Sequence, residues 1–148
     1  MEEIDILNRV LAIKARLSEL KNKYIESDPL QEYDYIKIYP VAPSIISNLK
    51  GYPADYKIFL EQIGEVYFVY CGCFMLEVML PSQVDCWWIS NNEITSNDDY
   101  KLLAHTDNDD IYHLIFDVSK SPHKRFLSYE NQPTLNLLEI VEEKLKYI

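Results

Sequence analysis

The chain has 148 residues, a formal net charge of −10 and a hydrophobic content of 48%, with 12 tyrosines. This length predicts a single domain, residues 1–148, that buries roughly two-thirds of its unfolded surface. The hydrophobic content indicates a packed core rather than disorder. Fourteen basic residues against 24 acidic ones argue against nucleic acid or an anionic membrane as a direct partner.

Three features predict a cytoplasmic protein. The start, MEEIDILNRV, places acids where a signal peptide carries bases, so export is not expected. No apolar run approaches the about 20 residues that a membrane-spanning helix needs. Three cysteines cannot all pair within the chain, which favours a reducing compartment over an extracellular disulfide framework.

An amphipathic helix is expected at the start of the chain, from about residue 3 to residue 25, within an N-terminal segment 1–26. One face repeats apolar side chains at alternating four- and three-residue steps: Ile6, Val10, Ile13, Leu17, Leu20 and Tyr24. The repeat lasts fewer than three heptads, which favours a helix packed on its own domain over a coiled coil. The core of the domain is expected over residues 33–148.

Two short helices are expected after a short strand in YDYIKIYP. The first lies in APSIISNLKG, and the second lies in YPADYKIFLEQIGE. In the second, Pro53 suits the first helical position, Asp55 lies near the positive end of the helix dipole, and Gly64 closes the helix. The apolar face of this helix comprises Tyr56, Phe59, Leu60 and Ile63.

From Val66 onward the pattern is that of β-strands. VYFVYCGCFMLEVMLP is too long for one buried strand, so Gly72 predicts a bend, a bulge or a tight turn within it. VDCWWIS, KLLAH, IYHLIFDV and KRFLSY are further strand candidates, and Thr134 is a candidate cap for a C-terminal helix. This order predicts an α+β fold with a mostly antiparallel sheet and N-terminal and C-terminal helices packed on it.

Negative charge is concentrated between residues 91 and 117. This stretch has a net charge of −6, from one base, Lys101, and seven acids: Glu93, Asp98, Asp99, Asp107, Asp109, Asp110 and Asp117. It is either a solvated acidic turn or an acidic surface that meets a basic protein. A calcium loop starting at Asp107 is disfavoured, because Ile111 and Tyr112 occupy the positions of an oxygen ligand and a glycine.

Candidates for a metal site or a nucleophile are limited to three cysteines and the histidines: Cys71, Cys73, Cys86, His105, His113 and His123. Their spacing does not match the paired ligands of zinc sites, and Cys71 and Cys73 are expected to share one face of a strand as small core residues. No nucleophile elbow or helix N-terminus accompanies a cysteine. No cofactor, metal or enzymatic activity is therefore predicted.

Trp87 and Trp88 are adjacent, so in a strand their side chains point to opposite faces. One of them is expected in the core. The other is either covered by a helix or exposed, and an exposed tryptophan beside acids is a plausible interface anchor.

The helix in APSIISNLKG is followed by a proline–acid–tyrosine step, Pro53, Asp55 and Tyr56, and by a helix that ends at Gly64. This order, with the later apolar run IYHLIFDVSK, resembles the SUKH superfamily of fungal cell-wall assembly regulators and bacterial immunity proteins. The resemblance covers most of residues 42–128 and the helical tail. Tyr52 stands where members often have leucine, and they often have a glycine-rich turn where only Gly64 is found here.

The resemblance implies a binding protein without a catalytic site, most simply an immunity protein that neutralises a bacterial toxin, frequently a nuclease. An acidic protein suits this role, because a nuclease presents a basic cleft to its substrate phosphates. The interface is expected at Glu93, Asp98, Asp99, Asp107, Asp109, Asp110, Trp87 and Trp88. The alternative is a regulatory scaffold or adaptor, related to regulators of cell-wall and glucan synthesis. An enzyme would instead gather His105, His113 and a cysteine in a deep pocket.

Overall fold

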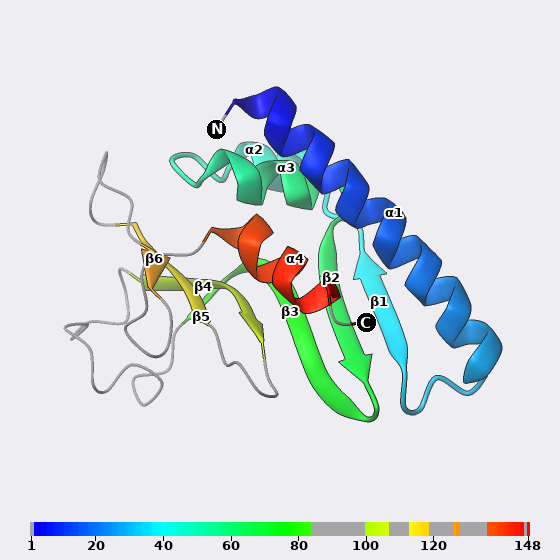
Figure 1. Cartoon of the computed structure of the whole chain (residues 1–148). Helices are drawn as coiled ribbons and strands as arrows, with labels where there is room; N and C mark the ends of the chain where they lie inside the picture. The colour runs from blue at the N-terminus through cyan, green and yellow to red at the C-terminus, as the bar shows by residue number, and fades with distance from the viewer. Residues whose placement is uncertain (1, 84–99, 107–112, 119–125, 128–135, 147) are drawn as a thin grey trace.

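The computed structural model describes residues 2–83, 100–106, 113–118, 126–127, 136–146 and 148. Its helices are α1 (Glu3–Ser27), α2 (Pro43–Ser47), α3 (Ala54–Gln62) and α4 (Leu137–Lys146). Its strands are β1 (Tyr35–Tyr39), β2 (Glu65–Tyr70), β3 (Cys73–Gln83), β4 (Tyr100–Thr106), β5 (His113–Asp117) and β6 (Phe126–Leu127). Over these residues the strands form one six-stranded antiparallel sheet in the order of the chain, with α4 in front of β2 and β3 in Figure 1. This confirms the predicted α+β class.

The predicted apolar stripe of α1 is buried along its whole length: Ile6, Val10, Ile13, Leu17, Leu20 and Tyr24. It packs on α3, β1 and α4, so α1 is a helix of the domain core rather than half of a coiled coil. Within the described part of the chain, no helix is long and apolar enough to span a bilayer.

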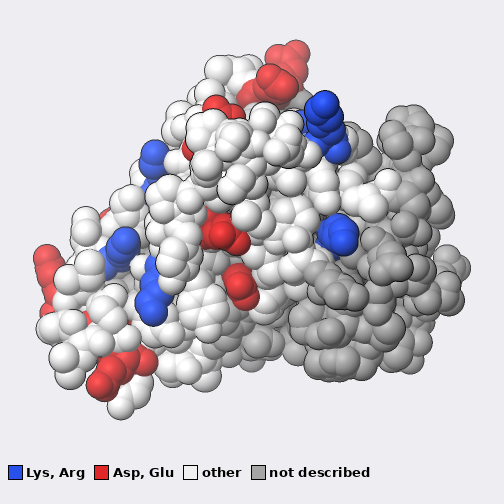
Figure 2. All heavy atoms as spheres, turned by 180° about the vertical axis from the view of Figure 1, so that it is seen from behind, with Lys and Arg blue, Asp and Glu red and all other residues white. Residues whose placement is uncertain are grey.

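The two faces of the sheet differ because side chains alternate along each strand. On the helix side, one row across four strands is fully buried: Ile36, Phe68, Leu76 and Thr106. The neighbouring row carries polar side chains and points the other way: Lys37, Tyr67, Glu77 and His105. Figure 2 looks onto this second side of the molecule. The helices therefore pack on the apolar face, and the polar face is turned away from them.

Strand β3 is irregular where it passes α3. Between Val78, which pairs with Ala104, and Ser82, which pairs with Leu102, three residues of β3 lie opposite one residue of β4. Here side chains form hydrogen bonds with backbone groups of β3 that have no partner in the neighbouring strand. The hydroxyl of Tyr56 donates to the carbonyl of Met79, and the N–H of Leu80 donates to Oε2 of Glu65 at 2.9 Å. The tyrosine of the proline–acid–tyrosine step thus holds the sheet to α3.

Replacing Tyr56 with phenylalanine is expected to lower the free energy of unfolding by about 1–3 kcal/mol, because the Met79 carbonyl loses a buried donor. Urea denaturation followed by circular dichroism measures this loss. Tyr52→Phe is the matched control: the Tyr52 ring lies 6.0 Å from the Tyr56 ring but is partly exposed, so its loss is expected to stay below about 0.5 kcal/mol. Equal losses in the two variants would show that the hydrogen bond to Met79 contributes nothing.

Asp55 joins two helix N-termini. Its Oδ1 accepts the Tyr56 N–H at 2.8 Å, and its carboxylate also accepts the backbone N–H of Leu137 at the start of α4. Burial raises the pKa of this carboxyl, while those backbone hydrogen bonds and the charge of Arg9 oppose the rise. Pro53 is the N-cap of α3 rather than its first helical residue, so the predicted boundary was wrong by one position.

Gly64 separates α3 from β2 and has a φ of +111°, a conformation that side chains rarely adopt. A Cβ at this position would lie 2.4 Å from the carbonyl oxygen of Tyr39 at the end of β1. The predicted role of Gly64 in closing the helix is confirmed, and the close approach of β1 adds a second reason for glycine.

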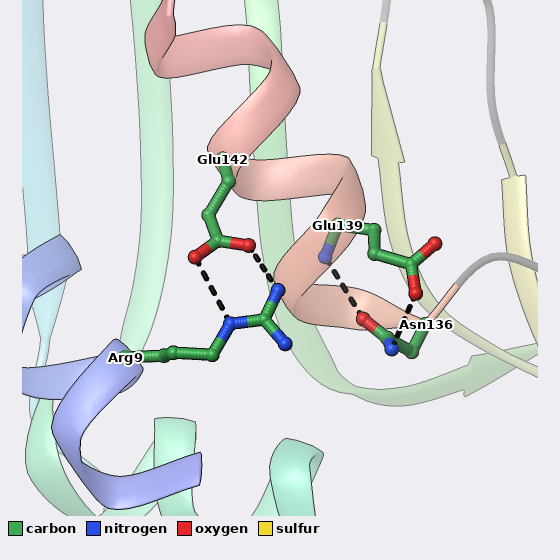
Figure 3. A network of polar contacts seen from close by, with 4 residues as sticks. All are labelled: Arg9, Asn136, Glu139 and Glu142. Atoms are coloured by element: carbon green, nitrogen blue, oxygen red, sulfur yellow. Dashed lines mark hydrogen bonds and ion pairs between the residues drawn. The ribbon is translucent and has the colours of Figure 1, made fainter. Parts of the chain in front are cut away.

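Helix α4 is capped by a side chain one residue before it begins. Asn136 accepts the Glu139 N–H at 2.8 Å and donates to the Glu139 carboxylate at 2.7 Å, which satisfies a donor of the first turn (Figure 3). The proposed cap Thr134 lies outside the described residues. Arg9 of α1 pairs with Glu142 of α4 through two contacts, of which Nε to Oε2 measures 3.1 Å. This pair is partly exposed, so it orients α4 more than it stabilises it.

Candidate functional site

All residues of the predicted interface lie outside the described residues: Glu93, Asp98, Asp99, Asp107, Asp109, Asp110, Trp87 and Trp88. Cys86 and His123 lie outside them as well. Cys71, Cys73 and His105 lie within the described residues, and so does the backbone of His113.

Cys71 and Cys73 are exposed at the turn between β2 and β3, so their prediction as core residues was wrong. The turn has two central residues with positive φ, Cys71 at +54° and Gly72 at +74°, as a type I′ hairpin turn requires. Of the three options for Gly72, the tight turn is therefore correct. Cysteine is an unusual residue at the first of these positions, where asparagine or aspartate is common.

The candidate catalytic groups are only partly brought together. His105 lies opposite His113 across β4 and β5, and its Nε2 lies 2.9 Å from Oε2 of Glu77. Cys73 is four positions along β3 from Glu77, which is roughly 13 Å at about 3.3 Å per residue. The thiols of the turn are therefore remote from His105. Within the described ranges, no cluster of three or more His, Cys, Asp or Glu side chains is placed to hold a metal.

A hollow of about 350 Å³ lies on the polar face of the sheet, over β1, β2 and β3. Its lining comprises Lys37, Tyr39, Glu65, Val66, Tyr67, Glu77 and Val78. At its side the rings of Tyr35 and Tyr67 stack with centroids 6.2 Å apart, and the Lys37 ammonium lies 5.1 Å from the Tyr35 centroid. Figure 2 shows acidic and basic groups mixed over this face rather than gathered by sign.

The hollow presents carboxylates, tyrosine rings and one ammonium group. Among the lining residues, Glu65 and Glu77 each use Oε2 in a contact within the protein. Carboxylates beside tyrosine rings bind a basic side chain well, because the rings add a cation–π attraction to the charge pairing. In this hollow the Lys37 ammonium already takes such a position, over the Tyr35 ring.

Apart from His105, the residues of this face could not be singled out from the sequence, for a geometric reason. Alternation in YIKIY indicates which side chains of β1 share a face, but only the register brings Glu77 and His105 beside Lys37 and Tyr67. A two-residue turn at Cys71–Gly72 is the one local signal that predicts the pairing of β2 with β3. Comparisons of the chain with models of known protein families, with curated proteins and with solved structures found no match.

Proposed function

We propose that this protein is a cytoplasmic immunity protein of SUKH type that neutralises a bacterial toxin, of nuclease type in the favoured case, by covering its basic active site. The observation that carries the proposal is the charge of residues 91–117, which is −6 of the total −10. A nuclease cleft is positive because it holds phosphates, so an acidic protein competes for it and is attracted over long range.

The described residues support a binding role in two ways. Asp55 and Tyr56 of the proline–acid–tyrosine step are engaged inside the fold, with Leu137 and Met79, so function is expected on the strands and loops that follow α3. The hollow lined by Glu65 and Glu77 offers a place for a basic side chain of the partner.

Affinity capture from the native cells, at low and then at high salt, tests the proposed function. One stoichiometric partner with a basic toxin-like domain, retained at low salt and released at high salt, is the expected result. Several weak partners from signalling or envelope assembly would instead support the regulatory scaffold. A partner released equally at both salt concentrations would contradict an electrostatic interface.

Replacing Asp107, Asp109 and Asp110 by asparagine in one variant is expected to weaken binding of the captured toxin about tenfold. Each exposed charge pair contributes about 0.2–1 kcal/mol, and three of them amount to about one decade of affinity. The dependence of affinity on salt is expected to flatten. Neutralising Glu2, Glu3 and Asp5 is the matched control, because it removes the same charge from α1 and its N-cap. Equal loss in both variants would assign the effect to net charge alone.

A further inference from the structure

Exposed apolar side chains gather at one end of the molecule, where α1 ends and the turn between β2 and β3 approaches it. Of the nine large hydrophobic side chains exposed among the described residues, four lie here: Ile25, Leu30, Tyr33 and Tyr70. Leu30 is 78% exposed and Tyr33 is 62% exposed, the two highest values of the nine. Single exposed hydrophobics are ordinary, but a group of them marks an interaction surface.

This end is held in one conformation by hydrogen bonds. Oδ2 of Asp28 accepts three successive backbone N–H groups of the loop, from Glu32 at 3.0 Å, Tyr33 at 2.7 Å and Asp34 at 3.1 Å. The loop then holds the turn: Asp34 accepts the Cys71 N–H at 2.7 Å, and the Tyr33 carbonyl accepts the Gly72 N–H at 2.7 Å. A surface ordered in advance loses less conformational entropy when a partner binds it.

The hydroxyl of Tyr24 lies beneath this surface and finds no hydrogen-bond partner among the described residues. Its ring is 6.3 Å from the Tyr70 ring, and the hydroxyl is within electrostatic range of Asp34 and Cys71. The Tyr24 and Tyr70 rings thus form an aromatic base for the exposed side chains at this end.

The charge around the apolar group is mostly negative, and its nearest bases in α1, Lys21 and Lys23, come just before the last turn of the helix. Residues 26–34, ESDPLQEYD, include Glu26, Asp28, Glu32 and Asp34 and no base, and the last turn of α1 carries no base either. In Figure 2 acidic atoms are seen at the lower left, where the end of α1 and the turn of the hairpin come together. The backbone hydrogen bonds from Tyr33 and Asp34 lower the pKa of Asp28, so this carboxylate stays ionised.

We propose that this end surface, comprising Leu30, Tyr33, Tyr70 and the Cys71–Cys73 turn with its acidic rim, docks a protein that presents basic side chains around an apolar one. A second copy of the chain is disfavoured, because it would bring two acidic rims together. Nucleic acid and anionic lipid are repelled by the same rim. The assignment rests on the proposed function for the basic character of the partner, and it gives that partner a contact far from residues 91–117 in the sequence.

The test uses a random 12-residue peptide library displayed on phage, selected on the purified full chain. Enriched peptides are expected to combine Arg or Lys with an aromatic or aliphatic residue, and their affinity is expected to fall at least tenfold for the double variant Leu30→Ser, Tyr33→Ser. Both side chains are so exposed that the fold is expected to persist. The matched control is Ile4→Ser, Leu11→Ser, which removes exposed apolar side chains from the other half of α1 and is expected to leave affinity unchanged.

The two thiols of the turn locate the bound peptide directly. In a Cys86→Ser chain, saturating peptide is expected to slow the reaction of Cys71 and Cys73 with a maleimide at least fivefold. Unchanged rates, equal affinities in the double variant and its control, or enriched peptides without basic residues would each overturn the docking surface. The peptides take the place of a toxin, so these outcomes leave the proposed immunity function standing, whereas failure of toxin capture leaves the peptide result intact.

Discussion

Replacing Gly64 with alanine is expected to lower the free energy of unfolding by at least about 3 kcal/mol. Alanine at a φ of +111° costs about 1–3 kcal/mol in backbone strain. A further loss follows because the new Cβ would lie 2.4 Å from the Tyr39 carbonyl oxygen, so β1 and the end of α3 must separate. Urea denaturation of the purified variant measures the loss, and a chain that fails to fold is the extreme of the same result, because native proteins are stable by only about 5–15 kcal/mol.

Gly51→Ala separates the two contributions. Gly51 also has a positive φ, +83°, but a Cβ there would meet no atom within 4 Å. Its loss is expected to be about 1 kcal/mol, which is the strain alone. Similar losses for the two alanine variants would mean that β1 moves aside at little cost and that the close approach of Tyr39 does not matter for stability.

Replacing Asp55 with alanine is expected to lower the free energy of unfolding by about 2–4 kcal/mol. The carboxylate accepts backbone N–H groups of Tyr56 and Leu137, and each donor left without a partner costs about 1–3 kcal/mol where it is buried. The loss is shared between the N-termini of α3 and α4, so hydrogen exchange is expected to quicken in the first turn of both helices. Faster exchange in α3 alone would contradict the link to α4.

Asp55→Asn tests the charge apart from the hydrogen bonds. Asparagine keeps an acceptor oxygen, and burial raises the folded-state pKa of Asp55 above its unfolded value. The folded wild type therefore binds more protons than its unfolded chain in that pH window, and its stability is highest below the ordinary aspartate pKa and falls as pH rises through the folded-state pKa. The asparagine variant lacks this fall, so it is expected to gain on the wild type as pH rises above the ordinary pKa of aspartate. A difference that is independent of pH would contradict the raised pKa.

The periodicity of α1 and the punctuation of α3 could be predicted from sequence because both are local. Six apolar residues at helical spacing predict α1 and its buried face, and Tyr56 and Phe59 predict the buried face of α3 in the same way. The boundary at Pro53 was wrong by one position, because a residue without an N–H fits the N-cap and the first helical position equally well. The hairpin turn at Cys71 could not be predicted from local sequence. The positive φ of Cys71 is supported by a hydrogen bond from its N–H to Asp34, which is far away in the chain.

The polar face and the end surface could not be predicted, because each depends on residues that are far apart in the chain. Lys37 and Glu77 line one hollow only through the register of β1, β2 and β3. Tyr33 meets Gly72, and Asp34 meets Cys71, only because the loop after α1 folds back on the hairpin. Composition did point to an acidic protein, and the acidic rim around Leu30 is one local expression of that charge.

The arrangement of the sheet bears on the order in which the protein folds. Each strand pairs with its neighbour in the chain, so the six strands can zip together as they are synthesised, with little loop entropy lost at each step. The sheet is nevertheless covered by two helices from opposite ends of the sequence, and Arg9 and Glu142, which join them, are 133 positions apart. The part of the apolar face that α4 covers therefore stays open to chaperones and to aggregation until residues 137–146 have left the ribosome.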